Sequence, residues 1–226
     1  RAATIRYRGE DMLGNLEAQN TALLVVDATP PQSSLSAEGP QFLDGATLWV
    51  SSHTGLVISD GDPDGGAGAA GVDSRTYRVD SGAPVEYDAA FTLAGRNEGL
   101  RILGFYAEDN VLNREVEHIQ SMGLDASPPT VNIFLPAADE TYLAGRDPIT
   151  VNFQVRDYFD IKPSSSAFLV RILDKGKTVA DVPRVPVFQG QVIDPATLDD
   201  GIWVLEVSAS DFVQNASSRA GGELEV

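Results

Sequence analysis

The run FYAEDNVLNRE at 105–115 decides the fold, because the chain repeats it: YRGEDMLGNLE at 7–17 aligns with it without gaps, and VSASDFVQNAS at 207–217 matches both more loosely. The first two copies lie about 98 residues apart. At the same offset Asp27-Ala28-Thr29-Pro30-Pro31 falls on Asp125-Ala126-Ser127-Pro128-Pro129. A fixed period of this kind is typical of tandem repeats. The sequence therefore predicts full repeats at 28–125 and 126–226, preceded at 1–27 by the last two strands of a further repeat.

The ends of the chain agree with this register. The first residues, RAATIRYRG, show neither an initiator Met nor the pattern of a signal peptide. We expect the chain to begin inside a repeat, downstream of another segment of its parent protein. Val226 lies one position before the place where a third linker Asp would fall, as expected for an end at a domain edge.

Apolar residues alternate with polar ones along each copy, which indicates strands with one face in a core. Leu103 and Phe105 point one way, as do Leu205 and Val207, and we expect Ile5 and Tyr7 to do the same in the first copy. Further short runs are rich in β-branched and aromatic residues and are bounded by Gly, Pro, Asp and Ser. These runs are 47–50, 56–59, 76–80, 150–155 and 168–173. About seven short strands per repeat predict an all-β fold of tandem immunoglobulin-like sandwiches.

Composition and charge exclude several classes of protein. The chain of 226 residues has 16 basic and 33 acidic residues, a net charge of −17, which repels nucleic-acid phosphates and anionic membranes. It has no run of about 18 apolar residues, so we expect no direct membrane insertion. With no Cys, the chain has neither disulfides nor thiolate metal ligands. We expect no nucleic-acid partner.

Four stretches of the chain are distinctive: FLDGATLWVSSHTGLVISD at 42–60, RTYRVDSGAPVEYDAAFTLAG at 75–95, GLRILGFYAEDNVLNRE at 99–115 and LDASPP at 124–129. They resemble bacterial immunoglobulin-like repeats, in particular the type known from a leptospiral outer-membrane protein and found in tandem in surface proteins. The resemblance covers the first full repeat and is looser in the second. It implies a secreted or cell-surface scaffold without a common catalytic site, used as a stalk, spacer or adhesive module.

The run Asp60-Gly61-Asp62-Pro63-Asp64-Gly65 has the alternating carboxylates that a hard cation requires. In a sandwich, this loop, the turn at 109–113 and the incoming linker reach the same end of the domain. Oxygen ligands without His or Cys favour calcium. We therefore predict a calcium site at the first junction from the acids and amide in these three segments. The predicted ligands are Asp27, Asp60, Asp62, Asp64, Asp109 and Asn113.

The next junction offers a similar, weaker set of candidate calcium ligands. They are Asp125, Asp157, Asp160, Asp211 and Asn215. An alternative interpretation leaves calcium out: Asp11, Asp109 and Asp211 would accept backbone hydrogen bonds within a tight turn, as Asp often does. Trp49 and Trp203 each lie on a predicted strand, where we expect a role in the core.

The sequence therefore favours a non-enzymatic structural or adhesive module that calcium stiffens at its junctions. Its expected partners are neighbouring repeats or subunits, and such modules also take a surface or matrix ligand. Two other functions stay open. In a filament or surface-layer subunit, residues 1–27 would complete a neighbour's sandwich by strand addition. A carbohydrate-binding accessory module of a secreted hydrolase would instead show a row of exposed aromatic residues.

Overall fold

A computed structural model describes residues 2–63, 69–159, 164–172 and 183–226. The described elements are strands, apart from a short 3-10 helix, η3 (Pro195–Thr197), so the all-β prediction is confirmed. The chain divides into two compact units. The first holds residues 1–39, 54–93 and 99–123, and the second holds 40–53, 94–98 and 124–226. Within the described residues, no helix has the length and apolar character needed to cross a membrane.

The N-terminal hairpin consists of β1 (Ala2–Tyr7) and β2 (Asn20–Val25), paired antiparallel from Ala2 opposite Val25 to Tyr7 opposite Asn20. Every residue of both strands is exposed. Ile5 and Tyr7, which the alternation assigns to a core face, are 47% and 56% exposed. The corresponding Leu103 and Phe105 are buried. The hairpin thus carries the apolar pattern of the later copies without their burial.

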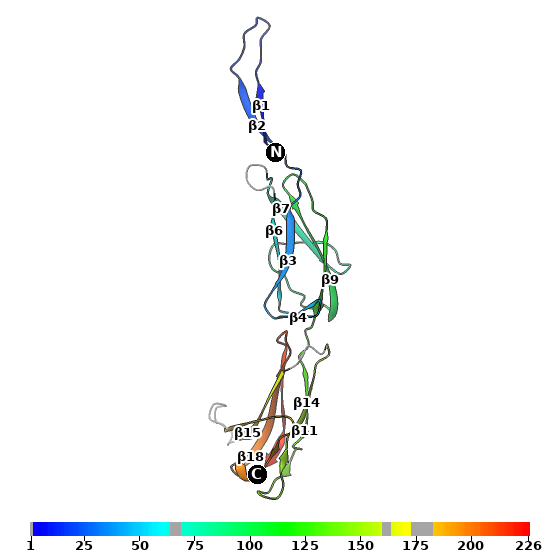
Figure 1. Ribbon diagram of the computed structural model, residues 1–226, viewed down its shortest axis with the longest axis vertical. Coiled ribbons are helices and arrows are strands. Elements are labelled where there is room, and N and C mark those ends of the chain that lie inside the picture. Colours follow the sequence, from blue (N-terminus) through cyan, green and yellow to red (C-terminus); the bar gives the residue numbers. More distant parts are fainter. Residues whose placement is uncertain (1, 64–68, 160–163, 173–182) are drawn as a thin grey trace. The chain divides into compact units, whose positions relative to one another are not determined.

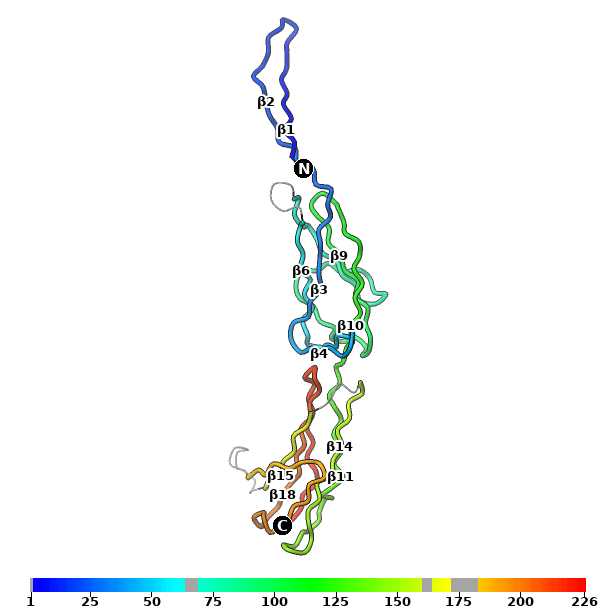
Figure 2. The backbone as a smooth tube through the Cα atoms, viewed as in Figure 1, coloured from blue at the N-terminus to red at the C-terminus, as the bar shows by residue number. Residues whose placement is uncertain are grey.

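The rest of the first unit is built from two sets of strands. They are β3 (Gln32–Glu38), β6 (Gly55–Gly61), β7 (Val72–Val79), β8 (Val85–Glu86), β9 (Gly99–Asp109) and β10 (His118–Leu124). β3 and β6 pair antiparallel and run side by side in Figure 2. The others follow the order β10-β9-β7-β8. Ile58 from β6 and Phe105 from β9 meet in one apolar cluster with Tyr87, so the two sets face each other across a core.

The second unit has more strands and a larger core. Its strands are β4 (Gln41–Asp44), β5 (Thr47–Val50), β11 (Thr130–Leu135), β12 (Glu140–Thr141), β13 (Ile149–Thr150), β14 (Asn152–Arg156), β15 (Ser164–Ile172), β16 (Arg184–Val187), β17 (Val192–Ile193), β18 (Ile202–Ser210) and β19 (Ala216–Glu225). One sheet has the order β12-β19-β18-β15-β16, and β11 pairs with β14. Figure 1 shows β11 and β14 on one side of this unit and β15 and β18 on the other.

The core of the second unit follows from the alternation along β18. Trp203, Leu205 and Val207 are buried, whereas Ser208 between Val207 and Ala209 is exposed. These side chains pack against Val131 and Phe153 from the facing strands. Burying each large apolar side chain contributes roughly 1.5–3 kcal/mol. The core therefore holds the sandwich rigid, and the loops at its ends can carry a site.

Candidate functional site

One tight turn recurs three times, at the tip of the N-terminal hairpin and after β9 and β18. In each copy the Asp backbone N–H donates to the carbonyl of an Asn four residues later, and the Asn backbone N–H donates to Asp Oδ1. The Asn side-chain amide also donates to Asp Oδ2, at 2.7–2.9 Å. The pairs are Asp11–Asn15, Asp109–Asn113 and Asp211–Asn215. All three Asp therefore accept hydrogen bonds within a turn, as the alternative interpretation expected.

The turn requires a left-handed backbone at its fourth position. That residue is Gly14, Leu112 or Gln214, with φ of 86°, 68° and 67°. Only the first is a glycine, so the later copies hold a side chain in a backbone region that costs roughly 1–2 kcal/mol. The hydrogen bonds between Asp and Asn offset that cost.

The same Asn side chains connect the turns to the linkers. Asn113 Nδ2 donates to the carbonyl of Asp27 at 3.3 Å, and Asn215 Nδ2 donates to the carbonyl of Asp125 at 3.1 Å. In the first unit Asp27 Oδ2 also accepts from the N–H of Ala70, at 2.6 Å. The linker, the turn and the end of the 60–74 loop thus meet, which is the arrangement that the topology predicted.

We expect removal of one of these amides to weaken the second unit. Asn215→Ala loses the hydrogen bonds to Asp211 Oδ2 and to the Asp125 carbonyl. At about 0.5–1.5 kcal/mol for each bond, the free energy of unfolding should fall by roughly 1–3 kcal/mol. Urea unfolding followed by circular dichroism measures this change. A variant as stable as the parent would contradict the role given to the amide.

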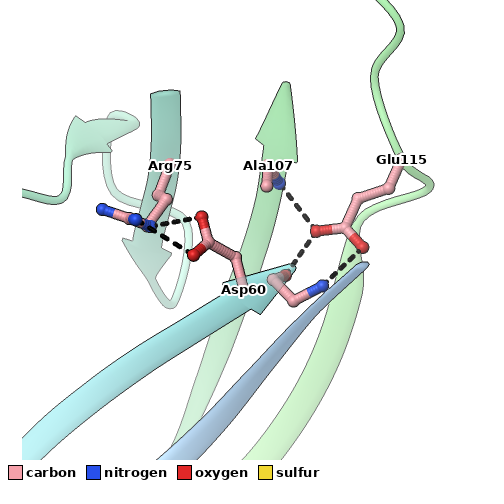
Figure 3. A network of polar contacts seen from close by, with 5 residues as sticks. Asp60, Arg75, Ala107 and Glu115 are labelled. Carbon is pink, nitrogen blue, oxygen red and sulfur yellow. Dashed lines mark hydrogen bonds and ion pairs between the residues drawn. The ribbon is translucent and has the colours of Figure 1, made fainter. Parts of the chain in front are cut away.

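The described acids of the first predicted set have donors within the protein. Asp60 accepts from Arg75 Nε at 2.5 Å and from Arg75 Nη2 at 2.9 Å, and this hydrogen bonding raises the pKa of Arg75 (Figure 3). Asp62 Oδ2 accepts from the N–H of Gly71 at 3.0 Å. Asp27 uses both oxygens, Oδ1 for Thr29 N–H and Oδ2 for Ala70 N–H.

The segments of the first set meet as predicted, but their described carboxylates do not gather around one point. Among the residues that the structure describes, Asp27, Asp60, Asp62 and Asp109 do not form a group able to share one cation. Asp64 lies outside the described residues. Figure 3 also shows Glu115, whose Oε1 accepts from the N–H of Ala107 at 2.7 Å and whose carboxylate accepts from the N–H and hydroxyl of Ser33. Calcium at this set remains a prediction.

The second set does bring acids together. One carboxylate oxygen from each of Asp125, Asp157 and Asp211 lies within 4.8 Å of the other two. Asp125 follows β10, Asp157 follows β14, and Asp211 starts the turn after β18, so the three come from separate segments. Asp160, the fourth predicted acid, lies outside the described residues. We call Asp125, Asp157 and Asp211 the acidic cluster.

Asp125 differs from its counterpart Asp27 in a way that points to a ligand. Its side chain is 0% exposed, and Oδ1 accepts from the N–H of Ser127 at 3.2 Å. Its Oδ2 is buried and has no hydrogen-bond partner. A buried oxygen of this kind costs about 1–3 kcal/mol when it is left without a partner, and more if it is charged. A cation shared by the acidic cluster would supply that partner.

Burial, together with the charge of neighbouring acids, raises the pKa values of two members of the acidic cluster. Burial, followed by the negative charge of Asp157, raises the pKa of Asp125 to about 7, and Asp211 and Glu98 add to the shift. Burial also raises the pKa of Asp211, against the hydrogen bonds from Asn215. In the equivalent turn of the first unit, burial is outweighed by hydrogen bonds from Asn113 and Val111, and the pKa of Asp109 is lowered. The same turn thus raises the pKa of its Asp where burial outweighs the hydrogen bonds of the turn, and the charge of Asp157 adds to that effect at Asp211.

Glu98 is a fourth acid near the cluster that sequence reasoning missed. Its Oε1 accepts from the N–H of Ala126 at 3.0 Å and from the hydroxyl of Ser127 at 2.6 Å. It thereby holds the linker at the two residues that directly follow Asp125. Glu98 lies in the loop before β9 within GRNEGL, a stretch without ligand spacing, so no sequence signal marks it.

Comparisons with known proteins yield no family for this chain. No protein-family model matches it, and no curated protein sequence matches it. Among solved structures it is similar to the fibronectin(III)-like modules of Clostridium thermocellum CbhA, at 14% identity and a TM-score of 0.41, covering 85% of this chain and 94% of that one. It is also similar to the FN1–FN3 domains of chicken CNTN1, at 10% identity and a TM-score of 0.32, covering 97% and 77%. A protocadherin gammaB7 EC3–6 structure matches at 12% identity and a TM-score of 0.28, covering 100% and 57%.

Proposed function

We propose that this chain is a non-enzymatic structural or adhesive repeat module, a stalk or spacer of a secreted or cell-surface protein, and that calcium stiffens it at the acidic cluster. The observation that carries the calcium part is the buried Oδ2 of Asp125, which has no hydrogen-bond partner and lies in a group with Asp157 and Asp211. The structural part rests on the recurring turn and on linkers that are tied into the domain ends.

The chemistry of the cluster supports calcium among the common cations. Calcium takes six to eight oxygen ligands, whereas zinc and copper favour His and Cys. The cluster supplies carboxylate oxygens, and the chain has no Cys. Backbone carbonyls and water would complete the coordination shell. Magnesium is the weaker candidate, because it requires near-ideal octahedral geometry and gives up its water reluctantly.

Calcium would stiffen this part of the chain by two physical effects. It neutralises carboxylates that repel one another, which at short range in a buried site is a large effect. It also ties together the linker after β10, the segment after β14 and the turn after β18, all of which bring an acid to the cluster. A module with these segments fixed transmits force and keeps its partners at a set distance, as a stalk requires.

Thermal melting with and without calcium tests this proposal. We expect calcium at 100 times its Kd to add about 2.7 kcal/mol to the free energy of unfolding, with a higher melting temperature than in excess chelator. Calorimetric titration of the full chain gives Kd, and magnesium serves as the control ion. Asp60→Asn is the matched control variant and should keep the calcium effect. Identical melting with calcium and with chelator would refute the calcium part.

A second candidate function is assembly by strand addition, favoured by the exposed N-terminal hairpin. The hairpin exposes Ile5 and Tyr7 of β1 and Leu23 of β2. Exposed apolar strands of this kind are prone to pair with other chains. In a filament or surface-layer subunit, a neighbouring subunit would cover residues 1–27. Sedimentation velocity over a range of concentrations separates the two candidates. A stalk stays monomeric, whereas a strand-addition subunit forms oligomers that Tyr7→Lys abolishes.

A further inference from the structure

The β4–β5 hairpin meets each of the three segments that bear the acidic cluster. In its register Phe42 lies directly opposite Trp49, so the two side chains lie on the same face of the hairpin. The Phe42 ring stacks on the ring of Phe212, with centroids 4.7 Å apart. The Trp49 ring contacts the ring of Phe159, with centroids 4.8 Å apart. Two aromatic contacts therefore connect this hairpin to two distant segments of the same unit.

Both aromatic partners lie beside an acid of the cluster. Phe212 directly follows Asp211, and Phe159 comes two residues after Asp157. The third acid is held by the backbone, since the N–H of Asp125 donates to the carbonyl of Val50 at 3.0 Å, and Val50 directly follows Trp49. Each member of the acidic cluster is thus anchored to the same ten-residue hairpin, through its own N–H or through a ring close to it in sequence.

We propose that the β4–β5 hairpin is the template on which the calcium site assembles. Phe42 and Trp49 are positioning residues for the segments that bear the acids. Bound calcium in turn holds residues 124–226 to the hairpin at residues 41–50. This inference rests on the proposed function, because it takes the acidic cluster to be a cation site. It goes further because it names residues outside the acidic cluster that set the affinity of the cluster for calcium.

The physical reason is that three carboxylates repel one another and need support to stay together. The protein must bring them together before the cation binds, and any disorder in the segments that bear them lowers the affinity. Stacking on Phe42 and Trp49 restrains the segments next to Asp211 and Asp157. When a restraint is lost, calcium must order that segment itself, and its Kd rises.

Calcium titration of the full chain and of four variants tests the template. We expect Phe42→Ala and Trp49→Ala each to raise the calcium Kd about tenfold, which corresponds to about 1.4 kcal/mol. Trp49→Phe keeps a ring to meet Phe159 and should restore near-parental affinity. Phe188→Ala removes an exposed aromatic residue of the same unit and should leave Kd unchanged. Circular dichroism at the titration temperature establishes that each variant is folded, and Phe42→Leu replaces Phe42→Ala if the latter unfolds.

The outcomes separate this inference from the proposal beneath it. If the parent chain binds no calcium, the proposed function fails and the template fails with it. If the parent binds calcium and both alanine variants bind it equally well, only the template is refuted. Affinity lost in Trp49→Ala and recovered in Trp49→Phe supports positioning by the ring. Equal loss in Phe188→Ala would assign the effect to general destabilisation and overturn the inference.

Discussion

Replacing Asp125 by Asn is expected to stabilise the calcium-free protein and to remove the stabilisation that calcium provides. At pH 8 the parent carboxylate is ionised although it is buried beside Asp157 and Asp211. Its pKa of about 7, against an ordinary value of 3.8, sets the cost of that charge at up to about 4 kcal/mol. Asn has nearly the same shape without the charge. Urea unfolding at pH 8, in chelator and in saturating calcium, measures both effects.

Asp27→Asn is the matched control, because Asp27 occupies the equivalent linker position. Both carboxylate oxygens of Asp27 accept hydrogen bonds from backbone N–H groups, those of Thr29 and Ala70. The Asn side chain has one acceptor oxygen and can keep only one of these two hydrogen bonds. We expect this variant to be destabilised by about 1–2 kcal/mol in chelator and in calcium alike. If Asp125→Asn were destabilised in chelator to the same extent, the electrostatic strain assigned to Asp125 would be refuted.

The second large effect is a pH dependence whose sign reverses with calcium. The folded-state pKa of Asp125, about 7, lies above the unfolded value of 3.8. Between these values the folded protein retains a proton that the unfolded chain has released. Without calcium, the stability that this retained proton provides is fully present below pH 3.8. It falls by up to about 4 kcal/mol as the pH rises to about 7. With calcium, stability should rise over the same range, because the ligands must lose their protons to bind the cation.

Unfolding measurements at half-unit steps from pH 4.5 to 8, in calcium-free buffer and in excess calcium, test this sign reversal. Asp11 and Asp109 do not interfere, because their pKa values are lowered. The stability that these two carboxylates contribute is lost only when the pH falls below the ordinary pKa of Asp. The difference between the parent and Asp125→Asn reports the titration of this carboxylate together with its coupling to Asp211 and Asp157. Curves with the same slope in both buffers would show that calcium and the proton do not compete at this carboxylate.

The recurrence of one motif made the fold predictable from the sequence. Period-two alternation placed Leu205 and Val207 on a core face, and both are fully buried. The sandwich topology that these patterns implied also predicted that a linker Asp and a turn Asn meet, as Asp125 and Asn215 do. Both predictions depend on local patterns that repeat, and such patterns can be read without knowledge of long-range contacts.

The choice between the two acidic sets could not be made from sequence. The alternating acids around Asp60 have the stronger motif, but Arg75 on β7 binds Asp60 through two hydrogen bonds. A motif records the spacing of acids and not the donors that the fold brings to them. Asp27 and Asp125 look equivalent in the alignment, and tertiary contacts distinguish them: the N–H of Ala70 reaches Asp27, whereas Asp157 and Asp211 lie beside Asp125.

Trp49 shows a further limit of sequence reasoning. Its place on a strand predicted a role in the core, yet the ring is only half-buried and contacts Phe159 beside the acidic cluster. A strand pattern identifies a face that packs against something, but it does not identify the partner. Glu98 had no pattern at all, because its role depends on a loop meeting a linker.

Anomalous diffraction from a crystal of the full chain grown with a calcium-like lanthanide tests the central claim most directly. The account predicts a strong peak among the carboxylates of Asp125, Asp157 and Asp211, with Asp125 Oδ2 as a ligand. A peak found only beside Asp60 and Asp62, or no ordered peak at any carboxylate, would contradict it.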